Sequence, residues 1–299
     1  METVQYIWMN GVQVPWDQAQ MHVLTHSLHY GGAVFEGIRF YETSDGPAIF
    51  RLKDHVERFF QSARVLQMNI PYLKDEIIAV IRELVRSNGI TSGYIRPIAY
   101  FAYGKMGLNP QGCPVHVAVG LWPWGAYLEK DVVRVKLSQY RRLHPETIHV
   151  EAKVTGHYVN SILASLEAHG LGFDEALLLD TDGNVAEGPG ENIFFVKNSI
   201  LYTPKRGSIL PGITRDSVMK LAKDHNFECK EKKIRMKELL QADEAFFTGT
   251  AAEITAIGSI DDVPVRNGSM GTLTKMFRNL YFDVVHGKND VYRHWLDVV

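Results

Sequence analysis

Strand and helix signals are mixed along this 299-residue chain without strict alternation, and this mixing most limits the folds that the chain can adopt. Strands are expected near residues 6–9, 12–14, 38–41, 48–50, 94–103, 115–122 and 133–137, and in a meander at 175–204. Helices are expected near residues 52–66, 77–85, 158–169, 214–226 and 273–286. A doubly wound parallel sheet would alternate strand and helix, so the pattern favours two α+β domains.

The stretch 123–127 combines proline, glycine and aromatic residues and is the best candidate for a connection between the domains. We therefore expect a smaller domain at 1–121, a connection at 122–132 and a larger domain at 133–299. Lys and Arg total 32 against 34 Asp and Glu, which argues against a nucleic-acid binder because such proteins normally carry a basic surplus. Two cysteines, and no apolar run of membrane-spanning length, favour a cytoplasmic globular protein.

A lysine at the end of a predicted strand is the first candidate for chemistry. If Ile148, Val150 and Ala152 face a core, alternation places Lys153 on the opposite face, before a turn at Gly156. Partial burial would lower the pKa of this amine and free its lone pair for a Schiff base. An ordinary surface lysine is the alternative interpretation.

Two glycines and a proline surround a carboxylate in the stretch 187–192. Glycine weakens a strand and often marks a close approach of the backbone to another group, so Glu187 is a second candidate. A bulge or a wide turn explains the same residues. A dinucleotide fingerprint is rejected, because Ile193 stands in place of the third glycine and no helical pattern follows.

Two further segments could present main-chain N–H groups to an anion. Residues 210–216 lead into a predicted helix, where the helix start and the Thr214 hydroxyl could bind phosphate, although a plain helix cap accounts for the same pattern. Residues 248–253 are small and follow a predicted strand, so their N–H groups could approach an anion closely; a tight turn is the alternative.

Three histidines, His22, His26 and His29, are spaced by four and three residues, as metal ligands on one helix face can be. The surrounding residues lack a clear helical pattern, and no carboxylate accompanies them in the arrangement that zinc enzymes use. Structural histidines are therefore preferred over a metal site.

Taken together and in order, these segments resemble the class IV (fold-type IV) pyridoxal-phosphate-dependent aminotransferases, and most closely the branched-chain amino-acid aminotransferases. The resemblance covers nearly the whole chain, from Tyr6-Ile7-Trp8-Met9-Asn10-Gly11 through Val34-Phe35-Glu36-Gly37-Ile38-Arg39 to Trp295-Leu296-Asp297. It implies a two-domain α+β fold like that of the D-amino-acid aminotransferases, with pyridoxal 5'-phosphate at the domain interface.

The resemblance also implies the residues of the cofactor site. Lys153 would be the catalytic Schiff-base lysine, Glu187 the carboxylate on the pyridine nitrogen, and Tyr158 the partner of the ring oxygen. The residues expected around the phosphate are Arg58, Ile213, Thr214, Gly249 and Thr250.

Substrate recognition is implied mainly for residues of the first domain. Tyr94 and Arg96 lie two apart on a predicted strand and so point the same way; the resemblance assigns them to the substrate carboxylates. Met106 and Leu108 resemble a loop that closes the site of a neighbouring subunit. The other residues expected to contact substrate are Tyr30, Phe35, Arg39, Trp124, Tyr127, Ala251 and Ala252.

The activity implied by the resemblance is transfer of the amino group of L-leucine, L-isoleucine or L-valine to 2-oxoglutarate, which gives 2-oxo acids and L-glutamate by a ping-pong mechanism. A homodimer, or a larger homo-oligomer built from dimers, is expected. A D-amino-acid aminotransferase or aminodeoxychorismate lyase of the same fold is the main alternative, and a metal hydrolase that uses the three histidines is a remote one.

Overall fold

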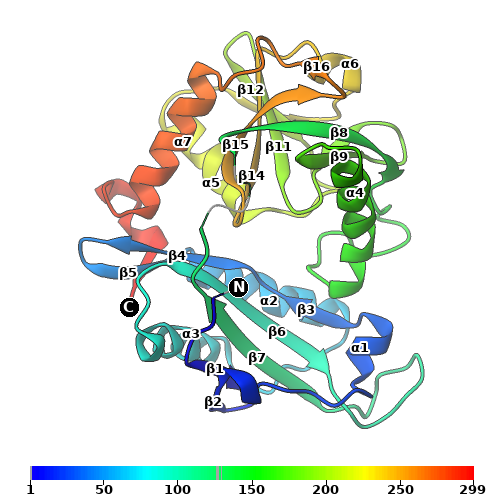
Figure 1. Ribbon diagram of the computed structural model, residues 1–299, viewed down its shortest axis with the longest axis vertical. Coiled ribbons are helices and arrows are strands. Elements are labelled where there is room, and N and C mark those ends of the chain that lie inside the picture. The colour runs from blue at the N-terminus through cyan, green and yellow to red at the C-terminus, as the bar shows by residue number, and fades with distance from the viewer. Residues whose placement is uncertain (1, 126–127, 129) are drawn as a thin grey trace. The chain divides into compact units, whose positions relative to one another are not determined.

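The computed structural model describes every residue except 1, 126–127 and 129. The chain forms two compact units (Figure 1). Unit 1 comprises Met1–Gly125, Ala152–Gly156 and Asp283–Val299. Unit 2 comprises Ala126–Glu151 and His157–Phe282.

Two segments from beyond residue 133 belong to unit 1. Val154 forms an isolated bridge with Val34, and strand β17 (Leu296–Val298) pairs antiparallel with β5 (Gly46–Phe50). These long-range pairings explain why the expected segment 133–299 is divided between the two units. The local sequence patterns contain no information about such pairings.

The sheet of unit 1 has eight strands within the described residues, in the order β17-β5-β4-β6-β7-β1-β2, with β3 beside β6. The strands not yet given are β1 (Tyr6–Met9), β2 (Val12–Pro15), β3 (Ala33–Phe35), β4 (Ile38–Thr43), β6 (Gly93–Phe101) and β7 (Val115–Trp122). The strands expected near residues 6–9, 12–14, 38–41 and 48–50 are confirmed and form two hairpins, in which β1 pairs with β2 and β4 with β5. Asn10 and Gly11 both have positive φ, as the two-residue turn requires.

Two predicted helices of unit 1, α2 (Leu52–Val65) and α3 (Lys74–Asn88), lie side by side against its sheet (Figure 1). The apolar periodicity is confirmed, because Val56, Phe59, Ile77 and Ile81 are all buried in one core. Helix α3 ends at Gly89, which has the left-handed conformation common at helix ends. Unit 1 also contains the short helices α1 (His26–Tyr30), η1 (Trp16–Gln18), η2 (Thr155–His157, which crosses the unit boundary) and η3 (Asp290–Trp295).

The sheet of unit 2 has nine strands in the described part of the chain, in the order β10-β9-β8-β15-β14-β11-β12-β13, with β16 beside β15. The strands are β8 (Val132–Arg141), β9 (Glu175–Leu179), β10 (Val185–Glu187), β11 (Asn192–Lys197), β12 (Ile200–Pro204), β13 (Cys229–Lys232), β14 (Glu244–Gly249), β15 (Glu253–Ile260) and β16 (Val263–Pro264). The predicted meander is confirmed in β9 to β12, whose successive pairings are antiparallel. Strand β8 pairs in parallel with β9 and β15.

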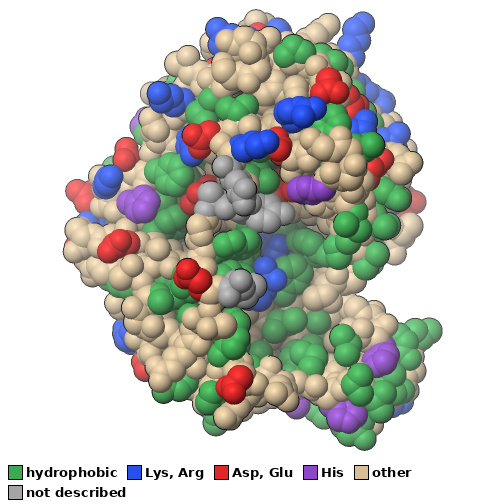
Figure 2. Space-filling view, viewed as in Figure 1, with side chains coloured by type: hydrophobic (Ala, Val, Ile, Leu, Met, Phe, Trp, Pro, Cys, Tyr) green, Lys and Arg blue, Asp and Glu red, His purple; other side chains and the backbone are tan. Residues whose placement is uncertain are grey.

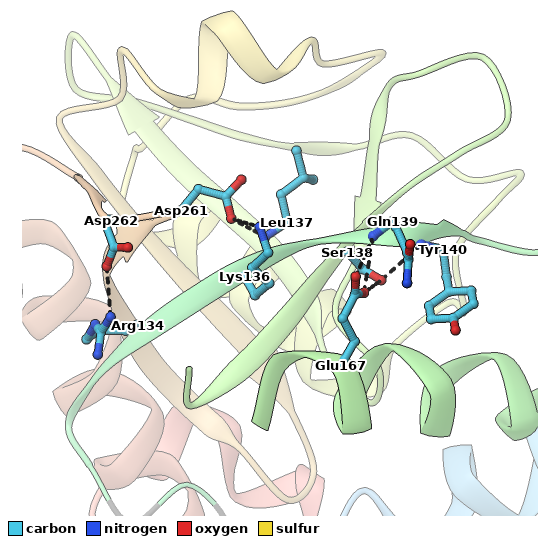
Figure 3. A network of polar contacts seen from close by, with 9 residues as sticks. All are labelled: Arg134, Lys136, Leu137, Ser138, Gln139, Tyr140, Glu167, Asp261 and Asp262. Carbon is cyan, nitrogen blue, oxygen red and sulfur yellow. Dashed lines mark hydrogen bonds and ion pairs between the residues drawn. The ribbon is translucent and has the colours of Figure 1, made fainter. Parts of the chain in front are cut away.

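Helix α4 (Tyr158–Gly170) is held on β8 and β9 by packing and by hydrogen bonds. Its residues Ala164 and Ala168 are buried in a small apolar cluster with residues of β9. Glu167 accepts a hydrogen bond from the Ser138 hydroxyl (2.6 Å) and another from the main-chain N–H of Gln139 (Figure 3). These contacts fix the helix that begins at Tyr158.

The remaining helices are α5 (Ile213–Asp224), α6 (Met236–Leu239) and α7 (Thr272–Val285). The predicted helices at 214–226 and 273–286 are therefore confirmed to within a few residues. None of the described helices combines the length and the apolar character needed to cross a membrane.

Candidate active site

Lys153 lies in an irregular segment of unit 1 and not at the end of a strand. The chain before Lys153 forms a turn, in which the carbonyl of His144 accepts a hydrogen bond from the N–H of Thr147 (2.9 Å). Ile148 is exposed, although the predicted alternation required it to be buried. The predicted strand through residues 148–152 is therefore wrong, because local hydrogen bonds to His144 replace the strand pairing.

The surroundings of Lys153 favour a nucleophilic amine. Its N–H donates to the Ser62 hydroxyl (2.9 Å), its carbonyl accepts from the N–H of Phe35 (3.1 Å), and its Nζ lies 4.8 Å from the centre of the Phe35 ring. Burial lowers the pKa of Lys153 to about 8, and the nearby charge of Arg58 adds to this effect while that of Glu36 opposes it. A lysine with this pKa is partly deprotonated near neutral pH.

A buried charge cluster, formed by Glu36, His55 and Arg58, lies in the same unit. Glu36 Oε1 accepts from Arg58 Nε (2.7 Å), and Oε2 accepts from Arg58 Nη2 (2.9 Å) and His55 Nδ1 (2.7 Å). Burial raises the pKa of Glu36, but Arg58 and His55 lower it more, so the carboxyl pKa falls well below its usual range. Burial lowers the pKa of His55, so a neutral imidazole donates to Glu36.

Arg58 was predicted from the sequence as a site residue, whereas Glu36 and His55 were not. Glu36 carries the single charge in the stretch 33–38, which is otherwise apolar or glycine. A lone carboxylate in such a run is a signal, because an acidic residue is rarely buried without a partner. Nothing in the local pattern identified His55 as one of its partners.

Tyr94 and Arg96 share one face of β6, as their spacing predicts. The Arg96 guanidinium lies 5.3 Å from the centre of the Tyr94 ring and 4.9 Å from that of Phe35. Trp124 packs edge-on against Tyr94, with ring centres 4.6 Å apart. A Cβ at Gly37 would lie 1.8 Å from the Tyr94 hydroxyl, so any residue other than glycine at this position would clash with that hydroxyl. Four of the residues predicted to bind substrate are thus brought together.

Arg39, which was also predicted to contact substrate, forms hydrogen bonds to main-chain carbonyl groups of the protein. Its Nη2 donates to the carbonyl oxygens of Trp124 (3.0 Å) and Gly125. Arg39 is buried on β4. It therefore fixes the segment that carries Trp124.

Other residues predicted to contact substrate lie on exposed parts of unit 1. Tyr30 is the last residue of α1 and is 43% exposed. Met106 and Leu108 lie between β6 and β7 and are 42% and 85% exposed. The predicted contribution of Tyr127 lies outside the described residues.

The three histidines considered for a metal site bind main-chain groups. His26 Nε2 lies 2.7 Å from the carbonyl of Gly107, and His29 Nε2 lies 2.9 Å from that of Val23. His22 accepts from a neighbouring main-chain N–H. Helix α1 begins at His26, so the three do not share a helix face. Among the residues described, no group of three or more His, Cys, Asp or Glu side chains is arranged to hold a metal ion.

Glu187 is buried in unit 2 at the centre of a hydrogen-bonded group. Its Oε1 accepts from Arg142 Nε (2.6 Å), its Oε2 accepts from Asn192 Nδ2 (2.9 Å), and the main-chain nitrogen of Leu210 lies 3.1 Å from Oε2. Glu187 pairs with Asn192 across residues 188–191, so the alternative interpretation of this stretch as a turn is also correct. Asn192 is the last residue of the stretch singled out in the sequence, but no role was predicted for it, and Arg142 was missed because it belongs to no recognisable pattern.

Two further predicted segments of unit 2 meet the Glu187 turn. Helix α5 begins at Ile213, and a Cβ on the preceding Gly212 would lie 2.0 Å from Asn192 Oδ1. The turn between β14 and β15 contains Gly249, where a Cβ would lie 3.3 Å from the Gly190 carbonyl. The structure thus brings together Glu187, the start of α5 and the turn that contains Gly249. The predicted residues on these two segments are Ile213, Thr214, Gly249, Thr250, Ala251 and Ala252.

Tyr158 is the first residue of α4, whose first turn contacts a partner of Glu187. Arg142, which pairs with Glu187, also has its Nη1 3.4 Å from Asn160 Oδ1 in the first turn of α4. Asn160 in turn donates to the carbonyl of Arg141 (2.9 Å). The first turn of α4 is therefore hydrogen-bonded to the end of β8 and to Arg142, the residue that follows this strand and pairs with Glu187.

An amine of lowered pKa in unit 1, and a buried carboxylate beside a helix start in unit 2, are the chemical groups that pyridoxal-phosphate aminotransferases use. Residues 33–260 match the family described as amino-transferase class IV, and the chain belongs to this family. The predicted family and fold are confirmed.

The chain is similar to proteins that share one activity. It is 45% identical to the branched-chain-amino-acid aminotransferase of Pseudomonas aeruginosa, over 98% of this chain and 97% of that protein. It is 40% identical to the protein of the same name from Escherichia coli K12, again over 98% and 97% of the two chains. A solved structure of the T.th. branched-chain amino acid aminotransferase with pyridoxamine 5'-phosphate superimposes with a TM-score of 0.97, at 46% identity, and covers 100% of this chain and 99% of that one.

Proposed function

We propose that this chain is a pyridoxal-phosphate-dependent aminotransferase that transfers the amino group of L-leucine, L-isoleucine or L-valine to 2-oxoglutarate and forms L-glutamate. The observation that carries the proposal is 45% identity over nearly the full length to a branched-chain-amino-acid aminotransferase. A related solved structure at 46% identity contains pyridoxamine 5'-phosphate.

The residues of both units fit such a cofactor. Lys153 offers an amine with a pKa of about 8, and Glu187 offers a buried carboxylate held by Arg142. The start of α5 presents main-chain N–H groups suited to a phosphate. Thr248 Oγ1 is buried and has no hydrogen-bond partner within the described part of the protein, as expected beside a polar ligand.

When bound, pyridoxal phosphate supplies an aldehyde for amines and a ring that withdraws electrons from the substrate's α-carbon. Lys153 would hold the cofactor through Nζ, and its free amine would take up and return the substrate's α-proton. Its lowered pKa suits this role, because general bases work best with pKa values near the working pH. Glu187 would lie at the pyridine nitrogen and would favour its protonated form through opposite charge.

Arg96 and Tyr94 are proposed to bind the substrate carboxylates. Arg96 Nε is buried, and no hydrogen-bond partner for it exists among the described atoms, so an incoming carboxylate would satisfy it. Phe35 and Trp124 add an apolar surface beside this pair for aliphatic side chains. The same arginine can bind the second carboxylate of glutamate, so one site serves both substrates of the exchange.

The proposal includes a homodimer, or a larger homo-oligomer built from dimers. In unit 2, an apolar surface on α4 is 40–66% exposed, and Figure 2 shows hydrophobic side chains gathered over this helix. It consists of Val159, Ile162, Leu163 and Leu166. Contiguous exposed apolar side chains are typical of subunit contacts. A cytoplasmic location is also proposed, supported by the free thiols of Cys113 and Cys229.

The first experiment measures transamination of L-leucine and of D-alanine with 2-oxoglutarate. We expect turnover of L-leucine; turnover of D-alanine alone would overturn the proposal. Borohydride reduction and peptide mapping should then find the cofactor on Lys153. Lys153→Ala should abolish activity, whereas Lys223→Ala, at an exposed lysine of α5, should not. A label on any other lysine would contradict the assigned role.

A further inference from the structure

Glu36 connects the two elements that hold the main chain of Lys153. It follows Phe35, whose N–H donates to the carbonyl of Lys153 (3.1 Å). Its partner Arg58 lies on α2 one turn before Ser62, whose hydroxyl accepts from the N–H of Lys153 (2.9 Å). The Glu36–Arg58 ion pair and the Lys153 peptide therefore link the same two segments of unit 1.

The contact between Glu36 and Arg58 also fixes the orientation of the guanidinium. Glu36 Oε1 accepts from Nε (2.7 Å) and Oε2 accepts from Nη2 (2.9 Å), which is the paired geometry that orients an arginine most strongly. His55 Nδ1 contacts the same Oε2 atom at 2.7 Å. All three side chains are buried, so water does not compete for these bonds.

We propose that Glu36 is a positioning residue, which fixes Arg58 and the Lys153 peptide together and supplies the negative charge of the buried cluster beside Lys153. This inference deepens the proposed function, on which the role of Lys153 rests. Glu36 does not contact the reacting atoms in this scheme; it acts through its two neighbours.

The charges around Lys153 come from three elements. Helix α2 contributes Arg58 and the neutral His55, β6 contributes Tyr94 and Arg96, and the segment after β3 contributes Glu36. The arginines lower the pKa of Lys153, whereas Glu36 and Tyr94 raise it. Glu36 therefore limits how far burial and the two arginines can lower the pKa.

A purely structural ion pair would make a different prediction. Loss of the pair would lower the free energy of unfolding, and removal of either partner would change this stability in the same direction. A charge that acts on Lys153 gives effects of opposite sign, because Glu36→Gln removes a negative charge and Arg58→Met a positive one. The titration of the lysine thus distinguishes the two roles.

The test measures the pH dependence of Lys153 acetylation in the full-length protein freed of cofactor, by competitive labelling and mass spectrometry. For the wild type we expect a midpoint at about 8. Glu36→Gln should lower the midpoint by about one pH unit, and Arg58→Met should raise it by a similar amount. Glu36→Asp, which keeps the charge, should stay near the wild type.

Unchanged midpoints in folded Glu36→Gln and Arg58→Met proteins would overturn the inference, as would shifts in the same direction. If Glu36→Gln does not fold, Arg58→Met alone provides the test. An upward shift of the Lys153 acetylation midpoint in Arg58→Met supports the proposed role of the ion pair, and an unchanged midpoint overturns it. The labelling reports on the amine and not on transamination. Borohydride mapping of the wild type tests the proposed function separately, so the two can fail independently.

Discussion

At the scale of single residues, Lys153 combines a chemical role with a cost to the folded state. Its pKa is lowered from 10.5 to about 8, mainly by burial. Between these values the unfolded chain binds a proton that the folded chain does not. The free energy of unfolding should therefore rise between pH 8 and pH 10.5. Below pH 8 the loss of stability caused by burying the charged amine is fully present.

This linkage gives a first prediction. The wild type should gain roughly 1–3 kcal/mol of stability between pH 8 and pH 10.5 relative to Lys153→Met, which has no charge to bury. Urea unfolding at several pH values measures the difference, and Lys223→Met serves as the control at an exposed lysine. A difference that does not vary with pH would show that the amine has an ordinary pKa.

Glu187 carries the second prediction at this scale. Glu187→Gln keeps the shape but removes the charge, so we expect activity to fall by about 10²–10⁴-fold with a smaller loss of cofactor affinity. Stability should also fall, by roughly 1–3 kcal/mol, because the buried Arg142 loses its counter-charge. Steady-state kinetics and urea unfolding test both effects. Glu146→Gln, at an 88% exposed side chain, should change neither; an equally active Glu187→Gln would refute the assigned role.

At the scale of elements, the sequence predicted whatever depends on local pattern. Asn10-Gly11 identified a hairpin and the spacing of Val56 and Phe59 identified α2, because turn conformation and helical periodicity depend on neighbouring residues. The segment before Lys153 was predicted incorrectly. There the hydrogen bonds to His144 determine the backbone, and apolar alternation contains no information about them.

The start of α5 allows a prediction for an element. A Cβ at Gly212 would lie 2.0 Å from Asn192 Oδ1, so Gly212→Ala must displace the amide that donates to Glu187. We expect a loss of about 1–3 kcal/mol in stability and weaker cofactor binding. Gly190→Ala is the matched control in the adjacent turn, since a Cβ there meets nothing within 4 Å.

Rescue of the clash provides the decisive comparison. Asn192→Ala removes the obstructing side chain, so adding Gly212→Ala to it should cost much less stability than adding Gly212→Ala to the wild type. Denaturant midpoints of the four proteins measure this coupling. If the stability losses of the two substitutions simply add, the Asn192 side chain does not restrict which residue can occupy position 212.

At the scale of the whole molecule, the sequence predicted two α+β bodies but could not predict which residues belong to each. Residues 152–156 and 283–299 join unit 1 through the Val34–Val154 bridge and the β5–β17 pairing. Residues more than one hundred positions apart form these contacts, so no local pattern predicts them. Arg142 was also missed, because its ion pair with Glu187, 45 positions away, is a contact that the fold creates.

The return of the chain end to unit 1 leads to a last prediction. Asp297 on β17 accepts from Arg82 Nε and Nη2, both at 2.6 Å, and its side chain is 11% exposed. Asp297→Asn should therefore destabilise unit 1 by roughly 1–2 kcal/mol, and less in 1 M salt, because the pair is partly screened there. Asp290→Asn, at a side chain 92% exposed, is the control. Equal urea midpoints for the two variants would mean that β17 holds to the sheet by main-chain pairing alone.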